Sequence, residues 1–347
     1  MLPFRTKPRR SKMSSSKLQI LLIFILTFFT FIYFYTIPEN LDDLESQIAE
    51  LNKDNEIGKT KIDKLEVALQ ASNIENILPQ NNVSYVVFNR VPKCGSMFLT
   101  TLCYKLGKIN KFTVESPYED GEKPQKSMSQ QSDFVTSFYN MKKPNLYIRH
   151  QWFINFEDFE QPNPIYINMI RDPISRFESF YYFSRFGNHK GGGGGAHQHD
   201  DIIKNESVDD CVRKRRKECL MPYWQIVPYF CGNDKRCAER GQWATDMAKT
   251  NIERYYLFVG TLEDLEGSLR TLSHLLPEYF ANALETSKEG ASVEMKEGTG
   301  TKNKKETSEE TKLFLRTETS LKYEYQLYDF VRHRLEAMKI KFGLEEL

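Results

Sequence analysis

Three features are missing from this sequence of 347 residues, and each absence excludes a class of protein. The 48 lysines and arginines are balanced by 47 aspartates and glutamates, so the net charge is only +1, whereas nucleic-acid-binding proteins usually carry a basic excess. No two of the six cysteines have the C-x₂-C spacing typical of structural zinc sites. The run G-x-x-x-x-G-K-[ST] is also absent, which excludes the P-loop of nucleotide triphosphatases. We therefore expect no nucleic-acid partner and no metal.

The longest apolar segment covers residues 18–37 and is interrupted only by Gln19 and three threonines. A helix of these 20 residues, with a rise of about 1.5 Å per residue, would cross a bilayer core of about 30 Å. Lysines and arginines precede it and acidic residues follow it, so the positive-inside rule predicts a cytosolic tail, residues 1–17, and a lumenal remainder. A cleaved signal peptide is the alternative, but the run is too long and no small-residue cleavage site follows. We expect a single-pass type II signal-anchor.

A lumenal location affects how the cysteines and asparagines are interpreted. Four cysteines fall close together, whereas Cys94 and Cys103 stand apart. An oxidising compartment favours disulfides, and the spacing suggests two local pairs, Cys211–Cys219 and Cys231–Cys237. Asn82 and Asn205 each begin an N-x-[ST] sequon and are predicted glycosylation sites.

Residues 38–81 follow the anchor and are predicted to form a helical stem. Apolar residues occupy one heptad frame over Leu41–Leu51 and again over Ile62–Leu69, but Asn55 and Gly58 interrupt it. This pattern is typical of a weak coiled coil that joins copies of the chain into a homo-oligomer, or of a solvated helical spacer. Pro79 ends the stem, so the lumenal domain is predicted to cover residues 82–347.

The stretch Tyr85–Met97 is the centre of the predicted domain. It begins with apolar and aromatic residues typical of a buried strand, which Pro92 ends. Gly95 permits a tight turn, and apolar residues at helical spacing follow. A loop that carries Lys93 and leads into a helix N-terminus is suited to an anion, because the amides, the helix dipole and the ammonium all attract negative charge. An ordinary turn with a surface lysine is the alternative.

Further elements alternate along the domain. Strands are predicted at residues 146–150, 164–170 and 256–259, and helices at 134–141, 174–186, 242–254, 262–276 and 312–341. The glycines at 191–195 are predicted to form a flexible surface loop, and the polar stretch 287–310 to be mobile or ordered by a ligand. Alternation of strands and helices predicts an α/β domain with a mainly parallel sheet. Ligands bind at the carboxyl ends of such strands, where the Lys93 loop and Arg171 would meet.

Several runs resemble the Golgi 2-O-sulfotransferases that sulfate uronic acids in glycosaminoglycans. The matching runs are Asn89–Lys93, Arg149-His150, Ile165–Pro173, Tyr181–Gly187, Pro228–Gly232, Trp243-Ala244 and Phe258–Gly260. Residues 94–96 and the ending Lys341–Leu344 are more similar to the uronyl 2-sulfotransferase and pipe branch than to the heparan sulfate branch. The resemblance implies a P-loop-like sulfotransferase fold, glycosaminoglycan substrates, location in the Golgi membrane, and the donor 3′-phosphoadenosine 5′-phosphosulfate.

The resemblance also implies a role for individual residues. His150 is the general base and Lys93 the cation beside the leaving group. The loop Lys93, Cys94, Gly95, Ser96 and Met97 would hold the 5′-phosphate, although the family often has a hydroxyl residue in place of Met97. The remaining implied contacts are Arg171 and Ser179 with the 3′-phosphate, Thr301, Lys304 and Lys305 with the nucleotide, and Arg90 and Tyr104 with the acceptor.

Some features and functions stay open at this stage. The basic run Arg213–Lys217 would either meet a polyanionic sugar chain or form a solvated face. His189, His197 and His199 lie in the glycine-rich loop and are expected to be solvated. The expected function is 2-O-sulfation of uronyl residues in chains such as dermatan or chondroitin sulfate. The alternatives are heparan sulfate 2-O-sulfotransfer, a non-catalytic lumenal glycan-binding protein, and a lumenal kinase, which would need carboxylates for Mg²⁺ beside Lys93.

Overall fold

A computed structural model of the chain describes residues 63–64, 66–67, 83–117, 123–187, 205–289, 301 and 303–345. The predicted signal-anchor, Asn82 and the histidines of the glycine-rich loop lie outside these residues. Within them, none of the helices combines the length and the apolar character needed to span a bilayer. Of the predicted stem, residues 63–64 and 66–67 are helical, and Val67 packs against the core of the domain.

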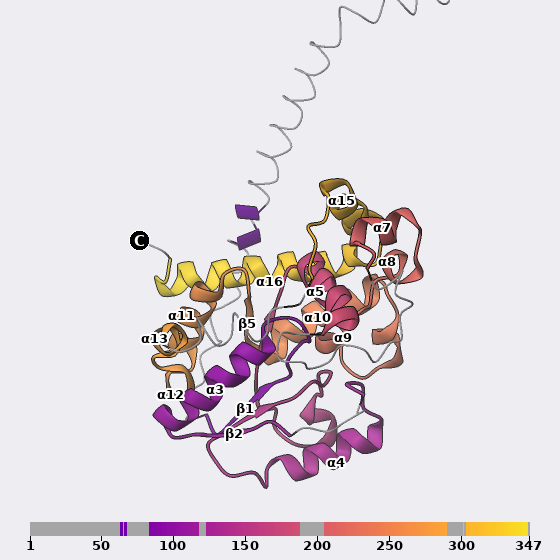
Figure 1. The fold of residues 1–347 in the computed structure, drawn as a ribbon. Helices are drawn as coiled ribbons and strands as arrows, with labels where there is room; N and C mark the ends of the chain where they lie inside the picture. The colour runs from indigo at the N-terminus through magenta and orange to yellow at the C-terminus, as the bar shows by residue number, and fades with distance from the viewer. Residues whose placement is uncertain are drawn as a thin grey trace, which may run out of the picture. The chain divides into compact units, whose positions relative to one another are not determined.

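The centre of the domain is a sheet of five strands in the order β2-β3-β1-β4-β5 (Figure 1). The strands are β1 (Tyr85–Phe88), β2 (Thr113–Glu115), β3 (Asn145–Ile148), β4 (Ile165–Ile170) and β5 (Tyr256–Thr261). All four pairings are parallel, so the predicted parallel sheet is confirmed. The chain leaves β1 toward β2, on one side of the sheet, but leaves the neighbouring β4 toward β5, on the other side. Connections that diverge between neighbouring strands open a crevice at their carboxyl ends, where ligands bind.

Both faces of the sheet are buried, because side chains of one strand point alternately to opposite faces. On β1, Tyr85 and Val87 join one hydrophobic core, whereas Val86 and Phe88 join the other. The strand sequences are therefore almost continuously apolar, as expected of a parallel sheet covered by helices on both sides.

Helices cover the two faces unequally. The smaller core lies under α3 (Ser96–Asn110), α11 (Leu265–Leu275), α12 (Pro277–Phe280) and α13 (Ala283–Lys288). The larger core takes its helical residues from α4 (Met128–Phe138), η1 (Phe156–Phe159), α5 (Pro173–Phe186), α7 (Val208–Arg213), α8 (Lys217–Leu220), α9 (Ile226–Cys231), η2 (Lys235–Ala238), α10 (Gln242–Tyr255) and α15 (Glu309–Glu318). The long helix α16 (Leu321–Phe342) packs along β5 and contributes Val331 to the larger core and Leu335 to the smaller one.

Two predicted helices were placed wrongly, and local capping explains both errors. The helix expected at 134–141 begins at Met128, because Ser127 and Gln130 form a capping box in which each side chain accepts a hydrogen bond from the other's amide. The helix expected at 312–341 is two helices, broken at Thr319, whose backbone is extended and whose hydroxyl accepts a hydrogen bond from the Leu321 amide at 3.2 Å. The three-residue strand β2 was not predicted, since it is too short to show an alternation.

Candidate functional site

The loop after β1 is held by a buried network of polar side chains. Asn89, at the end of β1, donates from Nδ2 to the carbonyl oxygen of Tyr229 at 2.9 Å. Its own Oδ1 accepts hydrogen bonds from Asn168 at 2.9 Å and from the Tyr256 hydroxyl at 3.0 Å. These side chains belong to β4, β5 and α9, so the network fixes the start of the loop against three neighbouring elements. A fully bonded buried network of this kind rigidifies the groups that it joins.

Lys93 lies in this loop with a backbone φ of 66°, a left-handed conformation that costs free energy for a residue with a Cβ. Its ammonium lies 3.9 Å from the ring centre of Phe183 on α5, within cation–π range. Burial and the nearby charge of Arg171 lower the pKa of Lys93 to about 8. Two cations therefore face one another at the carboxyl edge of the sheet, an arrangement that attracts a polyanion.

Gly95 connects this loop to α3. Its φ of 71° is left-handed, and a Cβ built on it would lie 2.8 Å from Cδ1 of Leu262. Among the described side chains none caps the first turn of α3, and its first residue is Ser96. The leading amides of a helix have no intrahelical acceptor, so this terminus presents donors to an anion. The Met97 side chain is exposed, which leaves its backbone amide as the group suited to binding.

His150 follows β3 and turns toward the same loop. Its Nδ1 lies 2.8 Å from the carbonyl oxygen of Arg90. A carbonyl oxygen only accepts hydrogen bonds, so Nδ1 carries the proton and Nε2 has a free lone pair. Burial and the charge of Arg90 lower the pKa of His150 to about 4, although the hydrogen bond to the Arg90 carbonyl opposes them. At neutral pH the imidazole is thus an uncharged base whose accepting nitrogen is Nε2.

Arg171 and Ser179 are set by the start of helix α5. Asp172 caps this helix by accepting a hydrogen bond from the Ser175 amide at 2.8 Å, and Pro173 occupies the first helical position. Arg171 therefore lies just before the helix, close enough to Lys93 to lower its pKa, and Ser179 is buried two turns along. The structure brings both residues to the edge that carries Lys93.

The segment predicted to contact the nucleotide crosses α5. The hydroxyl oxygens of Thr301 and Ser179 are 3.2 Å apart, and Lys304 forms an ion pair of 2.8 Å with the buried Glu178. Lys305 points elsewhere, because its ammonium donates to the carbonyl oxygen of Asn205 at 2.9 Å. A cavity of about 690 Å³ lies between this segment, the first turns of α5 and α15. Its lining includes four cations, Lys304, Lys305, Lys312 and Arg316, and four carboxylates, those of Asp172, Glu178, Glu306 and Glu309.

Arg90 and Tyr104 lie on the opposite side of the Lys93 loop. Arg90 donates to Thr100 of α3 at 3.4 Å, and Tyr104, one turn further along the same face, is 45% exposed. Among the described residues, neither Nε of Arg90 nor the buried hydroxyl of Tyr229 has a hydrogen-bond partner. Polar groups without a protein partner are suited to a polar ligand on this side.

The carboxylates at the sheet edge are already engaged. Asp172 accepts hydrogen bonds from the Ser175 amide and from the Tyr325 hydroxyl at 2.7 Å. Glu263 accepts from the Asp172 amide at 3.0 Å and from the Tyr328 hydroxyl at 3.1 Å. In the described residues, no group of three or more His, Cys, Asp or Glu side chains is placed to hold a metal ion. This arrangement gives no support to the kinase alternative.

Both expected disulfides are present, Cys211–Cys219 and Cys231–Cys237, and Cys94 and Cys103 are buried thiols. Burial raises the pKa of each thiol to about 12, so neither is a reactive thiolate near neutral pH. The Cys94 side chain is therefore a packing group, and only its backbone can serve an anion.

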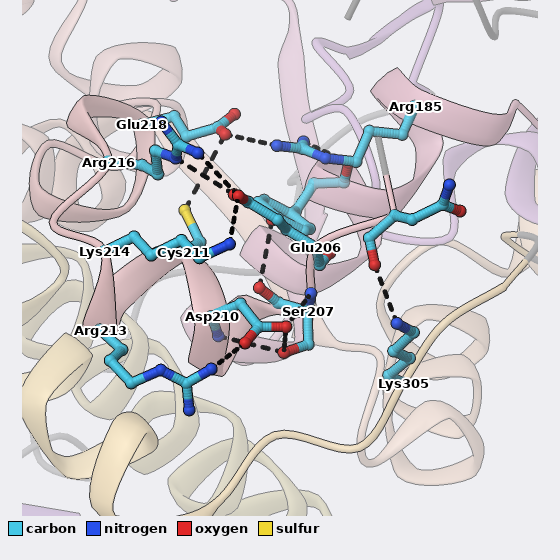
Figure 2. Close-up of polar contacts among 12 residues, drawn as sticks. Arg185, Glu206, Ser207, Asp210, Cys211, Arg213, Lys214, Arg216, Glu218 and Lys305 are labelled. Carbon is cyan, nitrogen blue, oxygen red and sulfur yellow. Dashed lines mark hydrogen bonds and ion pairs between the residues drawn. The ribbon is translucent and has the colours of Figure 1, made fainter. Parts of the chain in front are cut away.

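The basic run Arg213–Lys217 is an ion-pair network more than an open cationic strip. Lys214 and Arg216 both bind the buried carboxylate of Glu206, at 2.9 and 2.7 Å, and Arg213 pairs with Asp210 (Figure 2). The hydrogen bond from Arg216 is the largest influence that lowers the pKa of Glu206. Through these ion pairs the three side chains tie the first disulfide loop to Glu206 and Asp210.

Three contributors to the site were missed from the sequence: Phe183, Glu178 and the Asn89–Asn168 pair. Asparagine within an apolar strand was a usable signal, because a buried amide requires partners. Phe183 and Glu178 carried no such signal, since only the tertiary structure brings them to Lys93 and Lys304.

A strand–loop–helix turn suited to an anion, a second cation nearby and a neutral histidine are typical of an α/β protein that binds a phosphorylated ligand. Residues 80–337 match the model of the sulfotransferase family, and the chain belongs to this family. The resemblance found in the sequence is thereby confirmed.

Individual relatives are also similar. The chain is 34% identical over 272 residues to uronyl 2-sulfotransferase of Homo sapiens and 35% identical to that of Mus musculus. These alignments cover 76% of this chain and 65% of each relative, so the chain spans slightly less than two thirds of their length. It is 32% identical over 308 residues to heparan sulfate 2-O-sulfotransferase 1 of Xenopus laevis, with 85% of both chains covered.

Proposed function

We propose that the chain transfers a sulfuryl group from 3′-phosphoadenosine 5′-phosphosulfate to the 2-hydroxyl of uronyl residues in glycosaminoglycans such as dermatan or chondroitin sulfate. The observation that carries this proposal is the neutral His150, which presents Nε2 at the sheet edge that also holds Lys93. Membership of the sulfotransferase family and the similarity to uronyl 2-sulfotransferases support the reaction class.

The residues present fit a donor that bears phosphate at both ends. Lys93 and the leading amides of α3 are suited to the 5′ end, where no Cβ at Gly95 obstructs the backbone. Arg171 and Ser179 offer a guanidinium fork and a hydroxyl for the 3′-phosphate, with Thr301 adjacent. Two predicted nucleotide contacts are engaged within the protein: Lys304 pairs with Glu178, and the Lys305 ammonium donates to the carbonyl oxygen of Asn205.

Two side chains then carry the chemistry, and two others hold the acceptor. Nε2 of His150 takes the proton of the sugar 2-hydroxyl as its oxygen bonds to sulfur. The bond between sulfur and the phosphate oxygen breaks, and Lys93 neutralises the negative charge that develops on that oxygen. Arg90, with Tyr104 beyond it, lies where it can hold the acidic sugar chain. As in phosphoryl transfer, positioning and electrostatic stabilisation provide most of the rate enhancement.

The proposal also covers the membrane topology of the chain. Residues 18–37 would anchor the protein in the Golgi membrane with its tail in the cytosol, residues 38–81 would form a self-associating stem, and residues 82–347 would form the lumenal enzyme domain. The two disulfides support an oxidising compartment. The sequon at Asn205 lies on an exposed residue, as a glycan requires.

The deciding experiment offers radiolabelled donor and a panel of desulfated dermatan, chondroitin and heparan chains to the full chain in detergent. Label recovered at the uronyl 2-position of dermatan or chondroitin is expected. Label on heparan alone would favour the heparan sulfate alternative. Donor binding without transfer to any chain would instead identify a glycan-binding protein and overturn the proposal.

The dependence of kcat/KM on pH should be bell-shaped. His150 must be neutral, so activity should rise through its pKa of about 4, and Lys93 must be charged, so activity should fall through its pKa of about 8. In the pH profile of kcat the falling limb should lie at higher pH, because phosphates bound beside Lys93 favour its charged form. A rising limb centred at the ordinary histidine value of 6.5 would contradict the proposed state of His150.

Replacing Gly95 by alanine should weaken binding of adenosine 3′,5′-bisphosphate. The left-handed conformation costs a residue with a Cβ about 1–2 kcal/mol. If the loop of the variant adopts another conformation when no nucleotide is bound, this free energy is subtracted from binding, and the affinity falls by roughly 5- to 30-fold. Gly343→Ala is the matched control, because Gly343 has a φ of +64° and nothing within 4 Å of its Cβ position. Titration calorimetry should find weaker binding only for Gly95→Ala. Equal affinities would show that the turn does not bind the nucleotide.

A further inference from the structure

The segment predicted to contact the nucleotide is attached to a second part of the chain, the start of α7. Ser308 donates to Oδ1 of Asp209 from its hydroxyl at 2.7 Å and from its amide at 3.2 Å. Lys305 donates to the carbonyl oxygen of Asn205 at 2.9 Å. In Figure 1, α7 and α15 lie side by side, and contacts between these two helices agree with that view. Residues 303–308, here called the donor loop, therefore end on residues 205–209.

The other end of the donor loop rests on α5. Lys304 pairs with Glu178 at 2.8 Å, and Thr301, just before the loop, contacts Ser179. Glu178 is buried, and both it and Lys304 line the cavity between α5 and α15. With α5 holding one end and α7 the other, the donor loop forms one wall of that cavity.

The α7 end is a rigid support. The Cys211–Cys219 disulfide closes the chain just after it, and the carboxylate of Glu206, only 4% exposed, binds both Lys214 and Arg216 (Figure 2). The Tyr181 hydroxyl lies 3.3 Å from the carbonyl oxygens of both Glu206 and Ser207 and shares its one hydrogen between them, which ties the segment to α5. A buried carboxylate with two cationic partners is costly to disrupt.

Asp209 and Asp210 are adjacent in the chain, but their carboxylates bind different partners. Asp210 serves its own helix, because its carboxylate accepts from the Ser207 amide at 3.1 Å and pairs with Arg213. Asp209 reaches out of its helix to Ser308, nearly 100 residues further along the chain. The basic run and its disulfide loop thus follow directly on the residue that binds the donor loop, and they are not an isolated solvated face.

We propose that Asp209, at the start of α7, holds the donor loop in place and is thereby a positioning residue for the phosphorylated nucleotide. This inference rests on the proposed function, since it takes the cavity wall to be a nucleotide contact. Asp209 touches no reacting atom. It acts through Ser308 and Lys304, by holding the loop where the nucleotide meets it.

The test compares Asp209→Ala with Asp210→Ala in the full chain. Loss of a hydrogen-bonded charge should raise the Kd for adenosine 3′,5′-bisphosphate and the donor KM about tenfold in Asp209→Ala. The kcat at saturating donor and the acceptor KM should stay within about twofold, because the chemical step uses other residues. Asp210→Ala damages the cap of α7 but should bind the nucleotide like the unaltered chain.

Hydrogen exchange gives a readout that needs no nucleotide. Amides of residues 303–308 should exchange faster in Asp209→Ala, while those of α5 stay protected. Unchanged affinity in Asp209→Ala, or equal weakening in both variants, would overturn the inference and leave the proposed function standing. No nucleotide binding by the unaltered chain would overturn both.

Discussion

Replacing His150 by alanine should lower kcat by about 10²- to 10⁴-fold, the range that a general base contributes. The structure supplies the reason: the Arg90 carbonyl holds Nδ1, and burial lowers the pKa so that Nε2 accepts a proton at neutral pH. Affinity for adenosine 3′,5′-bisphosphate should change less than about threefold, because His150 follows β3 and the anion site follows β1. Single-turnover transfer to desulfated dermatan measures the loss directly.

The control is His274→Ala. His274 packs against Phe342 at a ring-centre distance of 4.6 Å, in a contact between α11 and α16 away from the sheet edge. This variant should lose some stability but keep its kcat. Added imidazole should restore part of the activity of His150→Ala and should have no effect on His274→Ala. Transfer by His150→Ala within tenfold of the unaltered chain would refute the role of general base.

The β1 loop shows how much of the site the sequence determines. Near-continuous apolar runs predict buried parallel strands, and Pro92, Lys93 and Gly95 predict where the first strand gives way to an anion-binding turn. Local propensity is enough for this step because the residues that form the turn are adjacent in the chain. The left-handed φ of Lys93 is different, since only neighbouring elements can hold a lysine there.

Contacts between distant residues account for what the sequence did not predict. Nothing near Lys304 in the chain specifies Glu178 as its partner, and nothing near Asp209 specifies Ser308. Charge runs are equally ambiguous: of the five basic residues in Arg213–Lys217, three are paired with Glu206 or Asp210 in three dimensions. The state of His150 also follows from the structure, because its pKa depends on burial and on Arg90.

Lys93→Met should lower kcat by about 10²- to 10³-fold. Methionine keeps the length and the contact with Phe183 but removes the charge that lies 3.9 Å from that ring. Negative charge on the leaving oxygen grows as the bond to sulfur breaks, so the ammonium stabilises the transition state more than the bound donor. Affinity for adenosine 3′,5′-bisphosphate should therefore fall less than kcat does. Steady-state kinetics and calorimetry on one preparation separate the two effects.

The pH profile distinguishes this role from simple charge attraction. If Lys93 is the group that must stay protonated, the residual activity of Lys93→Met should lose the fall through about pH 8, while the rise through about pH 4 remains. Lys108→Met is the control, because it removes one exposed positive charge from the last turn of α3 and should leave both limbs unchanged. A Lys93→Met variant with unchanged kcat and weaker donor binding would make Lys93 a binding residue only, since the ammonium would then stabilise the bound donor and the transition state equally.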